Sequence, residues 1–281
     1  MSHSGTLYVV ATPIGNLQDI TLRALEALKT ADLIAAEDTR HTAGLLGHFG
    51  LHKKMLALHE HNERQAGEKI LQVLQSGRNV ALVSDAGTPG ISDPGAVLVD
   101  MAHAAGLRVA PLPGPCAAIA ALSAAGLQQA RFLFYGFLPA GGAQRRKVLE
   151  GLRDTEITLV FYEAPHRVLE SLRDLAGTLG AGRQVVLARE LTKTFETIHR
   201  TTLGEAGAWL EADANRQRGE FVLLVEGAAT QAAAEVDAGA LRVLQLLLAE
   251  LPLKQAVKLA TEITGAKKNA LYQHALEFKA E

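Results

Sequence analysis

The sequence predicts an α/β protein of two domains, with a mainly parallel sheet in the N-terminal half, a mixed sheet in the C-terminal half, and a small helical tail. In the first half, short apolar runs alternate with helical segments, which is typical of a parallel sheet covered on both faces. In the second half, only two or three helices separate the strand candidates, which favours a mixed sheet. After Gly227 the chain has helical patterns alone.

The first half contains five expected strands, each a short run of aliphatic residues. These runs are residues 6–11, 33–36, 55–58, 79–83 and 107–111. Helices are expected through Leu22, Leu25 and Leu28, over residues 63–75, and over residues 96–102, where apolar residues recur at helical spacing.

The second half begins with an aromatic run and ends in an alanine-rich linker. Its expected strands are residues 131–137, 158–162, 184–188, 196–200 and 221–225. Gly141-Gly142 is a plausible flexible point. We therefore expect an N-terminal α/β domain at 1–127, a second α/β domain at 128–227, and a linker (228–234) followed by a helical extension to residue 281.

Composition excludes several classes of protein. The 281 residues carry a net charge of −2, so no global basic field indicates a nucleic-acid binder, and any such contact must be local. The single cysteine, Cys116, rules out an internal disulfide framework. The N-terminus lacks the pattern of a signal peptide, and three prolines interrupt the longest weakly polar stretch, 109–127. A cytoplasmic protein with no membrane span is expected.

The loop of residues 84–95 carries most of the chemical information. It follows the fourth strand, and ligands of open α/β sheets bind at the carboxyl ends of strands. Three glycines permit close backbone approach, two prolines stiffen the loop, and two aspartates supply charge. Asp85, next to the strand end, is expected to meet a ligand. Asp93, before Pro94, resembles the N-cap of the following helix.

Other strand ends also carry polar groups. Glu37 follows the second strand and His59 the third, and a charge placed at a buried strand end needs a partner or a purpose. Acid–base chemistry or nucleotide contact is expected there rather than a metal, because His59 and His61 lack a clear third ligand. The first loop, around Pro13, has no G-x-G-x-x-G pattern, so a ligand loop and a plain turn are equally compatible with it.

Two further segments combine a strand end with basic residues. Residues 163–167 (Glu-Ala-Pro-His-Arg) and 189–193 (Arg-Glu-Leu-Thr-Lys) each follow an apolar strand, and such groups near a helix N-terminus bind anions. Solvated surface pairs explain both segments equally well. The basic run 145–147 lies directly after Gly141-Gly142, and an exposed helix face is the alternative to a functional role. Cys116 is read as a buried apolar filler.

Taken together, these motifs resemble the bacterial 2′-O-ribose methyltransferases that modify a cytidine in the decoding centre of small-subunit ribosomal RNA, a family of the tetrapyrrole methylase superfamily. The resemblance covers about residues 5–227, and the combined motifs are highly specific. The segments that carry it are residues 10–17, 36–40, 59–62, 84–95, 113–117, 162–167 and 189–193.

The resemblance implies a two-domain tetrapyrrole-methylase-like fold, with S-adenosylmethionine bound in the cleft between the domains, and a homodimer. By motif position, it implies cofactor contacts at Pro13, Asp85, Gly87, Cys116, Ala117 and Tyr162. Cys116 departs from the pattern, because a small hydroxyl residue is expected there.

The resemblance also implies an RNA substrate in the small ribosomal subunit. Candidates for the group that activates the ribose hydroxyl are Glu37, His59 and Glu163, without a ranking. Candidates for RNA contacts are Arg40, Arg145, Arg146, Arg167, Arg189 and Lys193. The lysines of the helical tail are a further candidate, although a solvated bundle or a dimer prop explains them as well.

Two other functions remain open at this point. A tetrapyrrole (precorrin-type) C-methyltransferase has the same fold but needs a flat apolar trough, whereas the cleft positions here are polar. A nucleotide- or RNA-binding module without activity would bind the cofactor and not turn it over. The density of charged groups at strand ends favours the RNA methyltransferase.

Overall fold

The computed structural model describes residues 4–228 and 236–280. The chain forms two compact units. The larger, Met1–Arg153 with Ile157–Glu226, holds both α/β halves, and the smaller, Asp154–Glu156 with Gly227–Glu281, holds the helical tail. Apart from Ala228, the predicted linker 228–234 lies outside the described residues.

The first sheet is parallel throughout, with the strand order β3-β2-β4-β1-β5. Its strands are β1 (Thr6–Val10), β2 (Leu33–Ala36), β3 (Met55–Ala57), β4 (Val80–Val83) and β5 (Arg108–Leu112). This confirms the predicted parallel sheet, with strand ends within one residue of those expected. The order places β4 between β2 and β1, so the loops that follow these three strands meet at one edge.

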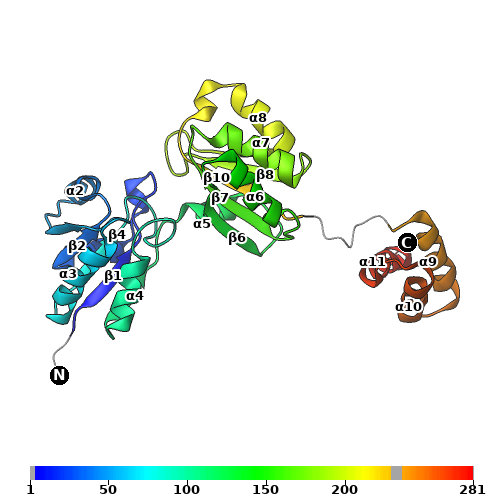
Figure 1. The fold of residues 1–281 in the computed structure, drawn as a ribbon, viewed down its shortest axis with the longest axis horizontal. Helices are drawn as coiled ribbons and strands as arrows, with labels where there is room; N and C mark the ends of the chain where they lie inside the picture. Colours follow the sequence, from blue (N-terminus) through cyan, green and yellow to red (C-terminus); the bar gives the residue numbers. More distant parts are fainter. Residues whose placement is uncertain (1–3, 229–235, 281) are drawn as a thin grey trace. The chain divides into compact units, whose positions relative to one another are not determined.

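Helices cover both faces of this sheet (Figure 1). They are α1 (Leu22–Thr30), α2 (Thr39–His48), α3 (Glu63–Gln75) and α4 (Ala96–Ala104), and a short 3₁₀ helix, η1 (Leu17–Asp19), precedes α1. On one face, Ile70 of α3 and Leu98 of α4 join a buried cluster with Leu82 of β4. On the other face, Leu28 of α1 and Leu46 of α2 pack in a cluster with sheet residues. Burial of these apolar side chains is the main stabilising contribution to this half.

The second sheet is mixed, as predicted, with the order β6-β7-β10-β8-β9. Its strands are β6 (Phe132–Phe137), β7 (Thr158–Glu163), β8 (Gln184–Arg189), β9 (Thr197–Thr202) and β10 (Phe221–Val225). Only β6 and β7 run parallel; the other three pairs are antiparallel.

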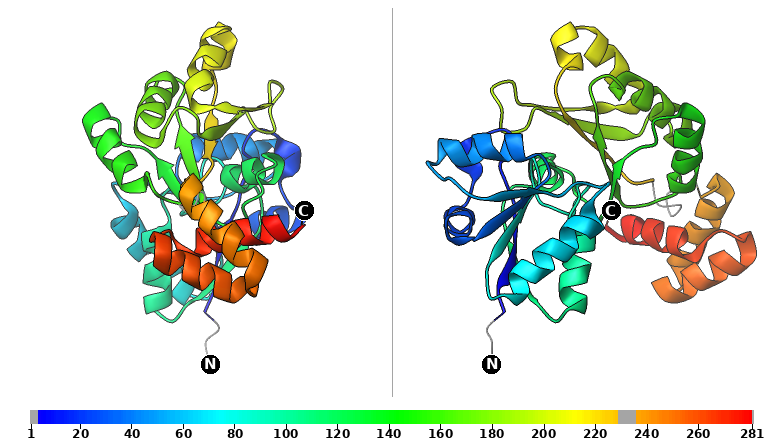
Figure 2. Two further views of the ribbon diagram at one scale, coloured as in Figure 1. Left: turned by 90° about the vertical axis from the view of Figure 1, so that its right-hand side faces the viewer. Right: turned by 60° about the vertical axis from the view of Figure 1, so that its left-hand side comes forward.

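One face of the second sheet packs against α6 (Gly142–Leu152), α7 (Val168–Leu179) and α8 (Leu203–Glu211). Figures 1 and 2 show α7 and α8 side by side over this face. A short 3₁₀ helix, η2 (Ala214–Gln217), follows α8.

The opposite face of the second sheet packs against α5 (Ala117–Ala124). Ala118 and Ala121 are buried in one cluster with Val160 of β7 and Leu224 of β10. Small alanine side chains let the helix approach the sheet closely. Helix α5, which lies within the predicted first domain (1–127), thus shares its core with the second sheet, which brings the loop at Cys116 against the second half.

The smaller unit is a bundle of α9 (Ala238–Glu250), α10 (Leu253–Thr264) and α11 (Lys268–Ala280). Leu244, Val257 and Leu271 form its core. Gly265 ends α10 with a φ of 70°, in the left-handed conformation that glycine adopts without strain. No described helix is long and apolar enough to cross a membrane.

The N-terminus of α4 corrects one prediction. Asp93 is not its N-cap; that position is Gly95, which has no side chain to offer. Instead, Glu63 of α3 accepts hydrogen bonds from the backbone N–H groups of Gly95 (2.8 Å), Val97 (2.9 Å) and Leu98 (3.3 Å). A cap supplied by another helix leaves no local sequence signal, which is why the prediction was wrong.

Replacing Glu63 with alanine should destabilise the protein by about 2–3 kcal/mol, because three N–H groups near the buried helix end lose a charged acceptor. Urea unfolding of E63A against the parent protein measures this change. The exposed Glu68 on the same helix provides the control, E68A, which should stay close to the parent. Equal midpoints for E63A and E68A would contradict the capping role.

Candidate functional site

The loops that follow β1 and β4 are joined by a pair of backbone hydrogen bonds. Thr12 N–H donates to Gly87 O (2.8 Å), and Gly87 N–H donates to Thr12 O (3.0 Å). Gly87 has a φ of 81°, a conformation that favours glycine, so this pairing depends on the residue type. The pairing holds the Asp85 loop against the first loop of the chain.

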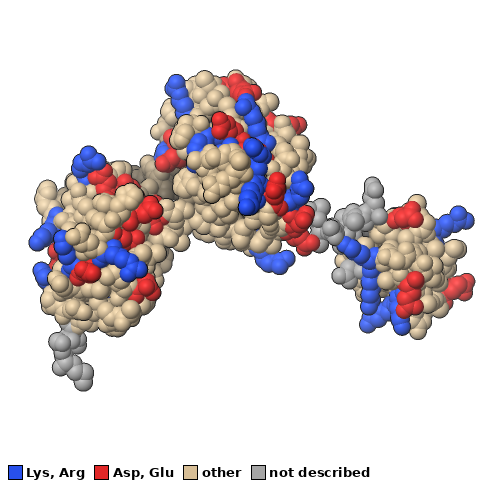
Figure 3. Space-filling view, in the orientation of Figure 1, with Lys and Arg blue, Asp and Glu red and all other residues tan. Residues whose placement is uncertain are grey.

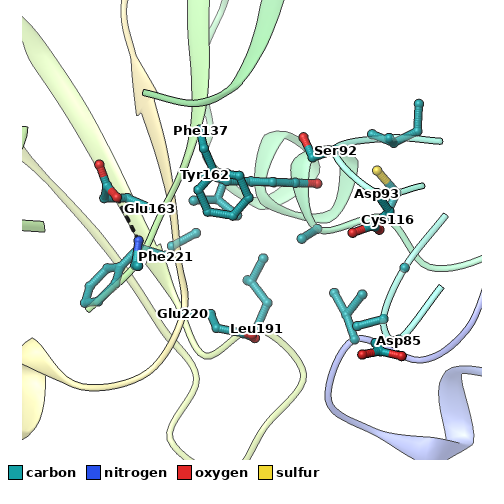
Figure 4. Close-up of a pocket in the computed structure, with 18 of the residues that line it drawn as sticks. Asp85, Ser92, Asp93, Cys116, Phe137, Tyr162, Glu163, Leu191, Glu220 and Phe221 are labelled. Atoms are coloured by element: carbon teal, nitrogen blue, oxygen red, sulfur yellow. Dashed lines mark hydrogen bonds between the residues drawn. The ribbon is translucent and has the colours of Figure 1, made fainter. Parts of the chain in front are cut away.

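A cavity of about 470 Å³ opens beside the Asp85 loop. Ile14, Cys116, Ala117 and the loop from Asp85 to Asp93 line one side. The other side comes from the second sheet, and Figure 4 shows Tyr162 and Phe137 facing the aspartates across it, whereas the side chains of Glu163 and Phe221 point away from the cavity. The cavity therefore lies where the two α/β halves meet, in the size range of small-molecule sites.

The cavity is acidic. Five acidic residues line it, Glu163 without its carboxylate, which bonds to Ser171 of α7, and no described Lys or Arg residue does. These acids are Glu37, Asp85, Asp93, Glu163 and Glu220, and one histidine, His166, is also present. Such a lining suits a cationic ligand and opposes a phosphate or another anion.

Glu37 and Asp85 are linked through the backbone. Asp85 N–H donates to Glu37 Oε2 at 3.4 Å, and Asp38 N–H donates to Asp85 Oδ1 at 3.0 Å. Burial raises the pKa of Glu37 above its ordinary value, and the charge of Asp85 adds to the effect. Glu37 is therefore a better proton acceptor than an ordinary surface carboxylate.

Asp93 faces the same cavity rather than the helix after it. Burial raises the pKa of Asp93 to about 6, and the nearby charge of Glu37 contributes. A hydrogen bond with Ser84 acts in the opposite direction. The sequence does not indicate this role, because an Asp-Pro pair also has the local pattern of a helix cap.

Tyr162 connects the two halves of the cavity. Ala118 N–H, in the first turn of α5, donates to Tyr162 Oη at 3.2 Å. Phe134 and Phe137 pack edge-on against its ring, with centroids 4.9 Å and 5.6 Å away. Burial raises the pKa of Tyr162, so the phenol stays neutral. The result is a rigid aromatic wall opposite the carboxylates.

Glu163 is buried and already has several partners. Its carboxylate accepts from Ser171 Oγ (2.5 Å) and from Ala164 N–H (2.9 Å), and Arg167 Nε lies 3.3 Å away. These contacts hold the turn between β7 and α7. A carboxylate occupied in this way is poorly placed to remove a proton from a substrate.

Most of the expected RNA-contact residues are engaged within the protein. Arg145 is buried and pairs with Asp174 at 2.7 Å. Arg189 is buried and donates to the carbonyls of Arg218 (3.0 Å) and Phe195 (3.1 Å). A basic residue after a strand has the same sequence pattern whether it binds phosphate or bonds to the fold.

Arg167 and Lys193 are also held by protein groups. Arg167 donates to Leu138 O, and Lys193 pairs with Glu190 (2.8 Å) and Glu220 (2.9 Å). Arg40 and Arg146 are the accessible members of the expected set. Arg40 is 90% exposed beside Asp38, and Arg146 is 53% exposed beside Asp174. On the face shown in Figure 3, blue and red residues are interspersed.

Two other expected residues do not line the acidic cavity. His59 is exposed and lines neither described cavity. Pro13 lines a second cavity of about 380 Å³, together with Leu17, Arg40, His41, Gly44, Leu45 and Asp85. Asp85 is thus shared by both cavities. In residues 4–228 and 236–280, no cluster of three or more His, Cys, Asp or Glu side chains has the arrangement of a metal site.

The fold is that of the tetrapyrrole methylase class. The family model for Tetrapyrrole (Corrin/Porphyrin) Methylases matches residues 6–207. Among solved structures, the methyltransferase CobJ has a TM-score of 0.61 at 24% identity and covers 81% of this chain and 96% of its own. Uroporphyrin-III C-methyl transferase from Thermus thermophilus, complexed with S-adenyl homocysteine, has a TM-score of 0.56 at 19% identity, covering 79% and 97%. These likenesses establish the fold.

Curated relatives define a narrower group. Ribosomal RNA small subunit methyltransferase I of Escherichia coli O157:H7 is 60% identical over 97% of this chain and 95% of its own length. The protein of the same name from Pseudomonas aeruginosa is 58% identical, covering 98% of each. The model for the RsmI C-terminal HTH domain matches residues 232–279. The chain therefore belongs to the ribosomal RNA small subunit methyltransferase I family.

The raised pKa of Asp93 generates a prediction about stability. The neutral carboxyl is favoured in the fold, so its stabilising contribution is present below about pH 4 and is lost as the pH rises through about 6. D93N should therefore gain stability relative to the parent between pH 4 and 7, on the order of 1 kcal/mol, since the group is partly exposed. Urea unfolding across this range measures the difference.

Asp100, exposed on α4 outside the cavity, provides the matched variant D100N. If D93N and D100N follow the same pH dependence relative to the parent, then the cavity does not hold Asp93 in its neutral form.

Proposed function

We propose that this protein transfers a methyl group from S-adenosylmethionine to the ribose 2′-hydroxyl of a cytidine in small-subunit ribosomal RNA. Membership of the ribosomal RNA small subunit methyltransferase I family supports ribosomal RNA methylation. The 2′-oxygen and the cytidine come from the resemblance of the motifs at the strand ends.

The observation that carries the proposal is the acidic cavity with an aromatic wall. S-adenosylmethionine carries a sulfonium and an ammonium, and carboxylates such as Asp85 and Asp93 favour both cations. Its adenine is flat and largely apolar, and Tyr162 and Phe137 offer a matching surface. The solved uroporphyrin-III C-methyl transferase, which has this fold, is complexed with the demethylated form of that donor.

The same acidity argues against a tetrapyrrole substrate in the cavity. Tetrapyrrole rings carry several carboxylates, and an acidic lining without Lys or Arg among the described residues repels them. The RNA backbone is an anion too, so its contacts are expected outside the cavity, at exposed cations such as Arg40 and Arg146.

Residues that line the cavity are proposed to hold the donor. They are Asp85, Gly87, Cys116, Ala117 and Tyr162. When bound, S-adenosylmethionine supplies an activated methyl group whose leaving group is a neutral thioether. The protein must then align the hydroxyl and accept its proton. Alignment contributes about 7–11 kcal/mol and a general base about 10²–10⁴-fold in rate, so positioning should dominate.

Glu37 is proposed as the proton acceptor. It lines the cavity, and burial raises its pKa toward the working range of a general base. The two other candidates are less suited, because His59 is exposed outside the cavity and Glu163 is held by Ser171.

The proposal includes a homodimer that acts in the bacterial cytoplasm, where small ribosomal subunits are assembled. The family resemblance supports both statements. RNA affinity is expected to be modest and sensitive to salt, because the net charge is −2 and each of the expected basic contacts already has a protein partner.

The proposed reaction predicts the loss of a ribose methyl group from a cytidine of the small-subunit RNA when this protein is removed. Mass spectrometry of nuclease digests from a deletion strain, compared with the same strain carrying the gene, measures it. Purified protein with labelled S-adenosylmethionine and subunits from the deletion strain should restore the mark. A methyl group placed on a base, on large-subunit RNA or on a tetrapyrrole would contradict the proposal.

Replacing Glu37 with glutamine should lower kcat by about 10²–10⁴-fold, because the proton acceptor is lost. Calorimetry should show S-adenosylhomocysteine binding close to that of the parent protein, since the amide keeps the shape of the side chain. The exposed Glu60 provides the control variant E60Q, with unchanged kcat. An active E37Q would rule out Glu37 as the base.

A further inference from the structure

The second cavity, defined by Pro13, Leu17, Arg40, His41, Gly44, Leu45 and Asp85, is not explained by the methyl donor. It lies between the loop after β1 and the helix α2. Its volume of about 380 Å³ is within the range of small-ligand sites. It shares only Asp85 with the acidic cavity.

Helix α2 leaves this cavity open at Gly44. A Cβ built at Gly44 meets no heavy atom within 4 Å, so packing does not require glycine there. Glycine within a helix is less stable than alanine by about 0.5–1 kcal/mol. The absence of a side chain lets the cavity extend to the helix backbone. Gly47, on the same helix, is equally unobstructed but does not line the cavity.

The walls of the second cavity differ chemically from those of the first. Leu17, which is 38% exposed, and Leu45 provide apolar contacts for a flat ring. Arg40 and His41 add basic groups. The pairing of Arg40 with Asp38 is at the surface and therefore weak, so its guanidinium can turn to a phosphate at little cost.

The two cavities share Asp85, which is bonded to Glu37 of the acidic cavity. A nucleotide with its base in the second cavity would bring its sugar to this junction, beside the donor cavity. RNA is commonly recognised through unstacked bases held against side chains, with arginine beside them.

We propose that the second cavity is the subsite for a nucleotide of the RNA substrate, with the base against Leu17, Leu45 and the Gly44 backbone, and a phosphate at Arg40. This inference rests on the proposed function and deepens it, because it assigns the acceptor a site distinct from that of the donor.

Filling the cavity tests the inference. G44L should raise the KM for small ribosomal subunits, and the Kd for a short fluorescein-labelled oligocytidylate, by about tenfold or more. S-adenosylhomocysteine binding should stay within about twofold of the parent, and the Tm should not fall, because leucine favours the helix. G47L introduces the same side chain outside the cavity and should match the parent in every measurement.

A second variant tests the phosphate contact. R40Q should reduce the slope of log Kd for the oligocytidylate against log salt by about 1, the change expected when one phosphate contact is lost. R64Q, at an exposed arginine of α3 outside the cavity, should leave the slope unchanged.

Three outcomes would overturn the inference. They are a G44L protein with the parent's KM and oligocytidylate Kd, a G44L protein that loses S-adenosylhomocysteine binding, and equal losses in G44L and G47L. If the parent binds the oligocytidylate through this cavity but methylates no ribosomal RNA, then the proposed function fails while the nucleotide subsite stands.

Discussion

The paired hydrogen bonds between Thr12 and Gly87 are the constraint on which the site depends. They join the loops after β1 and β4, so that Asp85 lies where the carboxyl ends of the parallel strands converge. In this position the backbone N–H of Asp85 donates a hydrogen bond to Glu37, and the Asp85 carboxylate accepts one from the backbone N–H of Asp38. Without these two hydrogen bonds between Thr12 and Gly87, the Asp85 loop would not be held as a wall of the acidic cavity. The residue that both cavities share, Asp85, would then also be displaced.

Two neighbouring cavities of opposite character follow from this arrangement. The first is acidic and faces an aromatic wall, which suits a cationic, partly aromatic donor. The second combines apolar side chains with Arg40 and His41, which suits a nucleotide. Because the acids would repel phosphate, the proposed separation of donor and RNA into two cavities would let one edge of the sheet bind ligands of opposite charge.

Several residues of the second half that were expected to bind RNA or to act in catalysis instead stabilise the fold. Two basic residues of this half, Arg145 of α6 and Arg189 at the end of β8, are buried in the fold, and Glu163 holds a turn through Ser171. Buried charges of this kind are costly unless they are paired, so the fold supplies the partners itself. The accessible basic residues of the expected set are Arg40 and Arg146, each paired with an aspartate at the surface.

The sequence alone determined the two sheets, nearly every strand boundary and the importance of the Asp85 loop, because strand periodicity and strand-end chemistry are local properties. Tertiary structure decided the partners. It placed Asp93 in the cavity, made Glu63 the cap of α4, and packed α5 on the second sheet. The contacts of Glu63 and α5 join residues that are distant in sequence, and Asp93 lines the cavity instead of capping the next helix. A local sequence pattern therefore cannot predict them.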